Sequence, residues 1–462
     1  MNNQDRFDRY VARNPHSHDF FFARPHWSRR GFFKMLGAGV AGSFLLEKPA
    51  LGEVVRRFGA PTRNTARSVI MILLSGAPSH TDTFDFKQSP STPAELLKPE
   101  TIGGVAWPTG LMPKLAANLP DMAIVRSARS WALQHSLGQA WVQIGRSPGA
   151  VLGDIAPNIG SIVAVEKEAE RTASQAFPAF LALNSDGAIG SGYMSAAYAP
   201  LRVVPSTAGL PDTQNPDGAT RFESKFAFAS ALDEPLRVTR PFSKEMADLE
   251  RFYRESKGLM YNASVDKAFR FTAEESARYG NNNFGNACLL ASKILAERGG
   301  TRYIQITLGG WDMHQNIYAA TGLPNNCRTL DNGVSQLIND LKSSGLLQET
   351  MVVMMGEFGR TTGRITAQNG RDHFLQQFVM FAGAGVKGGR TIGSTDATGS
   401  ATVETGWSRD RDIRPEDVEA TIYSALGIDW TSVRYDDPFQ RGFYYVPESN
   451  NDIYGPIEEL WS

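Results

Sequence analysis

Histidines and acidic residues gather in a few short segments of this 462-residue chain. His80 and Asp82 follow one apolar run, Asp312 and His314 follow a second, and His373 stands just before a third. Imidazole nitrogens and carboxylate oxygens together suit a divalent ion such as zinc or manganese. In an extended segment residues i and i+2 point the same way, which suits both Asp/His pairs. These residue types therefore indicate a shared metal or acid/base site.

Two serines stand next to histidines, because Ser136 follows His135 and Ser79 precedes His80. A hydroxyl group beside an imidazole is the usual pairing of a nucleophile with its general base. Ser136 is the first candidate nucleophile, with His135 as acid/base or metal ligand, and Ser79 is the second. Attack by water, without a protein nucleophile, is a third option.

Glycines surround Glu357 in the segment GEFGR and precede Asp312. Glycine lets the backbone approach a ligand closely, although simple turns also need it. Arg360, Arg371 and Arg146 are candidates for binding an anionic group through paired N–H groups. The predicted metal ligands are His80, Asp82, Asp312, His314, Glu357 and His373.

Each of these side chains also has a purely structural interpretation. A single loop histidine is more often hydrogen-bonded to its surroundings than bound to metal. Ser136 suits a helix N-terminus, and the arginines suit ion pairs. Position favours a shared site, because all the histidines beyond residue 52 lie next to the ends of predicted strands.

The chain alternates apolar runs with amphipathic stretches. The predicted strands are residues 69–74, 122–125, 179–183, 303–308, 351–355 and 378–381. The predicted helices are residues 110–119, 136–144, 159–168, 286–298, 330–342 and 414–426. Strands separated by helices are typical of an α/β fold, with a central, mainly parallel β-sheet and helices on both faces. Because ligands bind beyond the carboxyl ends of such strands, we expect the loops that carry the candidates to converge.

Composition is that of an ordinary globular chain, with 42% apolar and 21% charged residues. A net charge of -1 gives no electrostatic reason to expect nucleic acid as a partner. Only two cysteines, Cys288 and Cys327, are present, which excludes a disulfide scaffold and a thiolate zinc cluster. They form either one bridge or two separate thiols.

The predicted domain occupies residues 69–428, after a linker at residues 53–68. Residues 205–240 are rich in Pro, Ser, Thr and Asp, which predicts a surface insertion. Residues 241–280 have a helical pattern, so we expect the insertion to continue to about residue 280. Residues 429–462 are aromatic and irregular, and we expect them to pack on the domain as a tail.

Residues 1–52 are interpreted as a leader and export signal. Residues 28–34, SRRGFFK, and the mild apolar run 35–46 resemble a twin-arginine signal. That run is far short of the ~20 residues that a membrane span needs. The resemblance implies export of the folded protein by the twin-arginine translocase, cleavage near Gly52, and a periplasmic or extracellular location with no stable membrane span in the mature chain.

Five segments carry a wider resemblance: SGAPSHTDTFD at 75–85, GGWDMHQN at 309–316, GEFGRT at 356–361, GRDHF at 370–374 and AGAGVKGG at 382–389. In them the chain resembles the bacterial exported family catalogued as domain of unknown function 1501, from about residue 69 to 428. That family is similar to the alkaline phosphatase and sulfatase superfamily. The resemblance implies an alkaline phosphatase-like core with a two-metal, ester-hydrolysing site.

The resemblance also implies residue roles. Asp312 and His314 resemble the Asp/His pair of the first metal site, at closer spacing, and His373 resembles a late metal-binding histidine. Glu357 falls where the superfamily has the Asp of an Asp-His-Gly motif, and Phe358 replaces the histidine.

Other positions compare less directly with the superfamily. His80 and Asp82 lie near its first-strand acid, further into the loop. Residues 145–148, GRSP, look like the end of the sulfatase signature, but the position of its nucleophilic cysteine holds His135. Because no Cys-x-Pro-x-Arg exists, the sequence argues against a formylglycine sulfatase.

Together these patterns favour metal-assisted hydrolysis of a small anionic ester, either a phosphate or a related sulfate or phosphonate. The expected cofactor is a divalent metal ion: zinc, manganese or calcium. One alternative is a catalytically degenerate periplasmic or cell-surface binding protein. Another is a metal-independent esterase built on Ser79 and His80.

Overall fold

The computed structural model describes residues 55–172, 174–239 and 244–462. Contacts divide the chain into two units, residues 1–54 and 55–462, and every element below belongs to the second. The twin-arginine segment and the cleavage position near Gly52 lie outside the described residues, so both stay predictions. None of the described helices combines the length and the apolar character needed to cross a bilayer.

An eight-stranded sheet runs through the centre of the second unit, in the order β13-β5-β12-β9-β2-β8-β6-β7. All its neighbouring strands are parallel, except that β12 is antiparallel to both β5 and β9. The strands are β2 (Ser68–Leu74), β5 (Met122–Arg129), β6 (Phe180–Leu183), β7 (Leu201–Val203), β8 (Tyr303–Leu308), β9 (Thr350–Gly356), β12 (Gln376–Ala382) and β13 (Arg390–Ile392). The predicted α/β fold is therefore confirmed, and every predicted strand is present. The edge strands β7 and β13 were not predicted, because each has three residues and is too short to show a recognisable apolar run.

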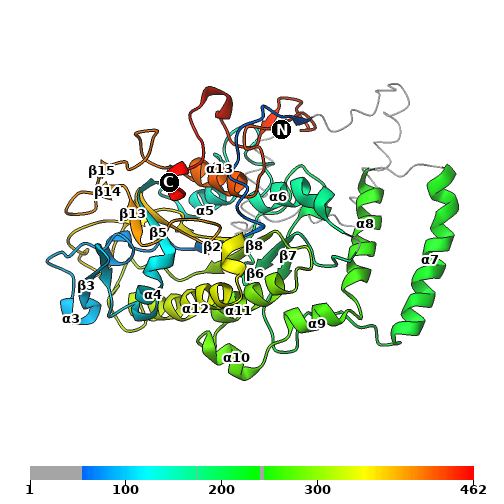
Figure 1. The fold of residues 1–462 in the computed structure, drawn as a ribbon, viewed down its shortest axis with the longest axis horizontal. Coiled ribbons are helices and arrows are strands. Elements are labelled where there is room, and N and C mark those ends of the chain that lie inside the picture. Colours follow the sequence, from blue (N-terminus) through cyan, green and yellow to red (C-terminus); the bar gives the residue numbers. More distant parts are fainter. Residues whose placement is uncertain (1–54, 173, 240–243) are drawn as a thin grey trace, which may run out of the picture. The chain divides into compact units, whose positions relative to one another are not determined.

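Helices cover both faces of this sheet (Figure 1). One face carries α4 (Pro113–Asn118), α11 (Asn283–Ala296) and α12 (Leu323–Ser343), and the other carries α5 (His135–Ile144), α6 (Ile159–Lys167) and α13 (Pro415–Ala425). Strand β2 shows how one strand serves two cores. Ile70 and Ile72 pack in the first core, on the face that carries α11 and α12, and Val69 and Met71 pack in the second core, on the opposite face. The reason is that successive side chains of a strand point to opposite faces.

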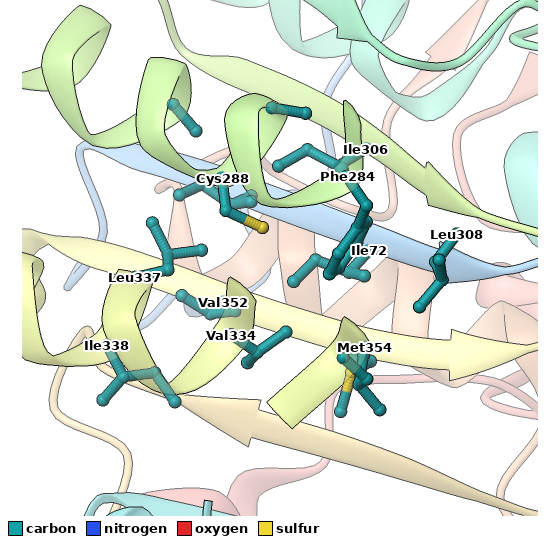
Figure 2. Close-up of a cluster of buried hydrophobic side chains, with 14 of the residues drawn as sticks. Ile72, Phe284, Cys288, Ile306, Leu308, Val334, Leu337, Ile338, Val352 and Met354 are labelled. Atoms are coloured by element: carbon teal, nitrogen blue, oxygen red, sulfur yellow. The ribbon is translucent and has the colours of Figure 1, made fainter. Parts of the chain in front are cut away.

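Figure 2 shows the first core, between the sheet and the helix pair α11 and α12. Ile72, Ile306 and Val352 come from three adjacent strands and are fully buried there. Burying each such side chain stabilises the fold by roughly 1.5–3 kcal/mol. Cys288 lies in the same core, and both it and Cys327 are buried and free.

The described part of the insertion holds four helices: α7 (Ala219–Thr239), α8 (Lys244–Leu259), α9 (Ala263–Phe269) and α10 (Ala273–Arg278). Residues 205–240 are thus half helical, which their Pro- and Ser-rich composition hid. Phe228 and Leu232 on α7 are 66% and 60% exposed, so this helix contributes little to the described core.

Short elements complete the described chain. They are β1 (Val55–Arg56), α3 (Ala94–Leu97), β3 (Pro99–Ile102), β4 (Val105–Pro108), β10 (Gly359–Arg360), β11 (His373–Phe374), β14 (Ser394–Thr395), β15 (Thr402–Glu404), β16 (Val433–Arg434) and β17 (Phe443–Tyr444). In the tail, β16 pairs with β1 and β17, and Ile457 and Leu460 are buried in the second core.

Candidate metal centre

The candidate site lies where loops from five strands meet. Strands β2, β5, β8 and β9 run parallel, so their carboxyl ends share one edge of the sheet. β12 runs the other way, which brings the residues before it to the same edge. Asp312 and His314 follow β8, Glu357 follows β9, His135 opens α5 after β5, and His373 precedes β12. The convergence expected from the sequence is therefore present in the structure.

Four side chains bring ligand atoms together there: His135, Asp312, His314 and His373. One ligand atom from each lies within 4.8 Å of all the others. The Nε2 atoms of His314 and His373 are 3.0 Å apart, and each faces Asp312 Oδ1, at 2.9 and 3.7 Å. His135 Nε2 lies 3.1 Å from the same oxygen. No other group of this kind was found among the described residues.

The other ring nitrogen of each histidine is hydrogen-bonded outward. The Nδ1 atoms of His135 and His314 lie 2.7 and 2.8 Å from carboxylate oxygens of Glu357 and Asp372. His373 Nδ1 lies 2.5 Å from the carbonyl oxygen of Leu133. Because these oxygens only accept, each Nδ1 carries the hydrogen, and a neutral ring then presents a lone pair at Nε2.

This arrangement fits a metal ion. When the three rings are neutral, three Nε2 lone pairs and one carboxylate oxygen converge, an arrangement that a cation relieves. His135 Nε2 is buried and faces Asp312 Oδ1 at 3.1 Å without good hydrogen-bond geometry. Ligands at zinc distances in a tetrahedral site stand about 3.3 Å apart, close to the spacings found here. Imidazole and carboxylate are also the nitrogen and oxygen donors that zinc commonly binds in proteins.

Arg360 fixes the carboxylate. Its Nη2 lies 2.6 Å from Asp312 Oδ1, and its N–H groups also donate to the carbonyl oxygens of Gly76, Ala77 and Arg371. Nη1 faces His314 Nε2 as well, at 3.3 Å. The guanidinium lowers the pKa of Asp312 through its hydrogen bond and charge, although burial by itself opposes the change. With its donors occupied and only 1% of its side chain exposed, Arg360 positions Asp312 and does not reach outward to a substrate.

Glu357 stands behind the four-atom cluster. It is fully buried, and its Oε1 accepts hydrogen bonds from His135, from the backbone N–H of Gly76 and from Gln139. The bond to Glu357 raises the pKa of His135, and Asp312 adds to the rise while burial opposes it. Burial lowers the pKa of His373, and the positive charge of Arg360 adds to that effect. Glu357 thus hydrogen-bonds His135 from outside the four-atom cluster, whereas the sequence placed it among the predicted ligands.

Glycine permits the close approach of these loops. Gly76 has a φ of +103°, and a Cβ there would lie 2.6 Å from the backbone nitrogen of Asp312. The β10 and β11 pair also matters, because its register sets Arg360 opposite His373. The segments SGAP and GEFG therefore have a steric reason for their glycines, since a Cβ on Gly359 would lie 1.9 Å from the carbonyl oxygen of Gln376.

The structure places His80 and Asp82 outside the cluster. His80 is fully buried, with Nε2 bonded to the carbonyl oxygen of Gly399, and burial lowers its pKa. Asp82 is fully buried too and pairs with Arg371 through contacts of 2.6 and 3.2 Å. The Tyr318 hydroxyl also donates to Asp82. These groups tie the first loop to the loop before His373, a role that requires no ion.

The candidate nucleophiles differ in access. Ser136 is exposed in the first turn of α5, directly after His135. Ser79 is 2% exposed, and its hydroxyl donates to Asp82. Arg146 is buried away from this edge and donates to the carbonyl oxygens of Tyr444 and Tyr445. Of these residues, only Ser136 combines exposure with a place beside a cluster histidine.

Sequence reasoning missed the groups that orient the ligands. Asp372 directly precedes His373 in GRDHF, and that adjacency was the available signal. Gln139 lies one helical turn after His135, so the sequence also contained the information needed to predict its place near that histidine. The carbonyl of Leu133 had no signal, because any residue carries that group.

Comparison with known proteins identifies the family. The family model described as "Protein of unknown function (DUF1501)" matches residues 66–442, while no match was found among curated proteins. Among solved structures, the chain is similar to Ps i-CgsB in complex with k-i-k-neocarrahexaose, with 12% identity, 84% of this chain and 77% of that chain covered, and a TM-score of 0.40. It is similar to a phosphonate monoester hydrolase from Silicibacter pomeroyi, with 12% identity, coverages of 78% and 73%, and a TM-score of 0.38. It is also similar to an alkaline phosphatase superfamily protein from Vibrio parahaemolyticus, with 9% identity, coverages of 89% and 77%, and a TM-score of 0.36. The family match spans most of the chain and confirms the resemblance seen in its five motifs: the chain belongs to the DUF1501 family.

Proposed function

We propose that this chain is a metal-dependent hydrolase of small phosphate esters, or of related sulfate or phosphonate esters. One observation carries the proposal: three imidazole Nε2 atoms and Asp312 Oδ1 converge, while every Nδ1 is bonded outward. Outer carboxylates and carbonyls that fix the histidine tautomer are typical of metal sites.

The chain's own residues have separable tasks in this proposal. His135, His314, His373 and Asp312 would hold the ion, which supplies a Lewis acid that stabilises negative charge on the ester. Arg360 holds Asp312 in place. The first turn of α5 lies at this edge, and the positive end of its helix dipole favours an anionic group there.

Ser136 is the side-chain nucleophile that fits the proposal, because it is exposed and adjacent to His135. Its attack would transfer the phosphoryl group to the hydroxyl oxygen and release the alcohol, and water would then release phosphate. Direct attack by water achieves the same result in one step. The variant Ser136→Ala separates the two routes, since only the first requires the hydroxyl.

The test measures metal content and turnover together. We expect the full chain, loaded with Zn²⁺ or Mn²⁺ and dialysed, to retain about one ion per chain and to cleave p-nitrophenyl phosphate. His314→Ala should lose the ion and at least about 100-fold in kcat/KM, since it removes a ligand and its link to Asp372. The control is Asp452→Ala, because Asp452 is 83% exposed in the tail, where it pairs with Arg409. A wild-type chain that binds no ion from either metal contradicts the proposal.

The alternative, a binding protein without catalysis, is favoured by a specific feature. Phe358, where the resemblance suggests a second ligand histidine, is fully buried, with its ring 4.8 Å from the rings of both His135 and His373. An aromatic ring there offers no ligand atom. A chain that retains its ion but turns over neither phosphate, phosphonate nor sulfate esters would support this alternative.

A further inference from the structure

A hollow of about 450 Å³ lies beyond the carboxyl end of β5, at the same edge of the sheet as the candidate metal centre. Apolar groups on its walls include Trp131, Val403 and Tyr454, and charged groups include Arg411, Asp412 and Arg414. Its volume is within the range of small-molecule sites. Two other hollows in the described chain are lined by residues such as Arg67 and Arg298 near the amino ends of the strands, away from the cluster.

A single short loop joins the hollow to the metal centre. Trp131 lines the hollow, the carbonyl of Leu133 binds His373 Nδ1, and His135 begins the next helix. Four residues of fully extended chain span at most about 14 Å, so the Cα atoms of Trp131 and His135 lie no further apart than that. The two places are therefore within the reach of one ligand of moderate length.

The apolar part of the wall is open to solvent. Val403 is 65% exposed, Ile453 is 44% exposed and Trp131 is 43% exposed, although large apolar side chains usually seek burial. Trp131 is also held firmly: its Nε1 donates to Glu416, and the guanidinium of Arg414 lies 3.9 Å from its ring centroid. A rigid, exposed aromatic wall is suited to binding an apolar ring.

The charges beside this wall favour an anion. Arg411 is neutralised by two contacts of 2.7 and 2.8 Å with Asp417, so it serves as part of the wall. Arg414 and Arg129 face the single carboxylate of Asp412, at 3.9 and 3.7 Å. Glu416 adds a carboxyl group behind Trp131, but burial raises its pKa to about 7, so Arg414 and Arg129 still outweigh the acids around them. The Arg129 side chain is 41% exposed.

We propose that this hollow binds the organic group of the ester, and that this group is an aromatic or similarly apolar ring carrying a further negative charge. The proposal rests on the proposed function, since the reacting ester is placed at the metal centre. Trp131 contacts the ring, and Arg414 and Arg129 attract the extra charge. The hollow therefore selects among esters that the metal centre treats alike.

Binding of two fluorescent probes tests the hollow without any hydrolysis. 8-Anilinonaphthalene-1-sulfonate carries a ring system and a negative charge, and N-phenyl-1-naphthylamine carries the same rings without the charge. We expect Trp131→Ala to weaken binding of both probes to the full chain. Val403→Glu should weaken sulfonate binding by about three- to tenfold and Val403→Lys should strengthen it, because each places a charge at the rim, while the neutral probe changes by less than about twofold. Val403 is exposed, so neither variant disturbs the core.

Phe228→Ala is the matched control, because Phe228 is an exposed aromatic residue on α7. If sulfonate binding is the same in wild type and in the Trp131 and Val403 variants, the hollow is not the site. If both probes respond equally to the two Val403 charges, the ligand carries no negative charge. If tetragalacturonate displaces the sulfonate and loses affinity in Trp131→Ala, the ligand is an acidic saccharide and the apolar-ring proposal is wrong.

A kinetic comparison separates this inference from the proposed function. In Val403→Glu the KM of a sulfonated naphthyl phosphate should rise more than the KM of p-nitrophenyl phosphate. Probe binding that follows the pattern above in a chain without turnover would retain the hollow and reject the hydrolase. Turnover in which both esters respond equally to Val403→Glu would retain the hydrolase and reject the hollow.

Discussion

The donor and acceptor pattern of three histidines is the most informative feature at the scale of single residues. A histidine that donates from Nδ1 to a carboxylate or a carbonyl has its Nε2 lone pair directed the opposite way. In His135, His314 and His373 these three directions meet at Asp312. Isolated structural histidines would have no reason to share one target.

Asp372 provides a residue-scale prediction about metal affinity. It is 61% exposed and accepts from His314 Nδ1, so its loss should leave the fold intact but release the ligand ring. We expect Asp372→Ala to weaken Zn²⁺ binding by about 10- to 100-fold. Asp372→Asn should cost less, since its amide oxygen still accepts. Competition with a chromogenic chelator measures both values, and equal affinity in wild type and Asp372→Ala would argue against an orienting role.

At the scale of elements, helix α13 carries acidic side chains into the second core. Glu416 accepts from the indole N–H groups of Trp131 and Trp141, and Glu419 accepts from the Tyr423 hydroxyl. Burial raises the pKa of Glu416 to about 7 and that of Glu419 to about 8. Because Trp131 leads into the loop that contacts His373, α13 supports one loop of the candidate metal centre.

These carboxyl groups predict a pH dependence of stability. An unfolded glutamate titrates near pH ~4.3, so between about pH 4.3 and 8 the folded chain binds more protons than the unfolded chain. Their contribution is complete below that range and is lost as the pH rises through 7 and 8. We expect the Tm of Glu419→Gln, relative to wild type, to increase from pH 5 to pH 8.5. Both proteins are measured with chelator, so that any metal effect cancels, and a constant Tm difference would show that Glu419 does not titrate in this range.

At the scale of the whole molecule, the candidate ligands come from separate parts of the sequence. His135 follows β5, Asp312 and His314 follow β8, and His373 lies in β11. An ion held by all of them would bind only the folded chain, because unfolding separates these segments. Metal and fold are therefore expected to stabilise one another.

This linkage predicts a metal-dependent Tm. Free ion at 100 times its Kd should stabilise the fold by about 2.7 kcal/mol, and a chelator should remove the effect. His314→Ala should show the Tm of the chelated wild type, with or without ion. The matched check is Asp452→Ala, which should respond to ion as wild type does. An ion that leaves the wild-type Tm unchanged while binding stoichiometrically would place its site outside these loops.

The alternation of strands and helices was readable from the sequence because each buried strand of this sheet is a short, continuous apolar run. The motif loops were also readable, since polar and glycine residues follow those runs directly. Parallel strands then force the loops to one edge, which made Asp312, His314 and His373 sound candidates before any coordinates. The sequence did not reveal the helix α7, whose polar composition resembles a loop.

By itself, then, the sequence determined the family, the fold class and the edge of the sheet at which the chemistry-bearing residues gather. Only the tertiary structure decided how they divide between roles. In the structure Glu357 hydrogen-bonds His135, Asp82 pairs with Arg371, and the carbonyl of Leu133 accepts from His373. The physical reason is that periodicity and residue type specify the local backbone and its burial. A side chain's partner comes from another segment, and its identity depends on distances of a few ångströms that only the packed molecule sets.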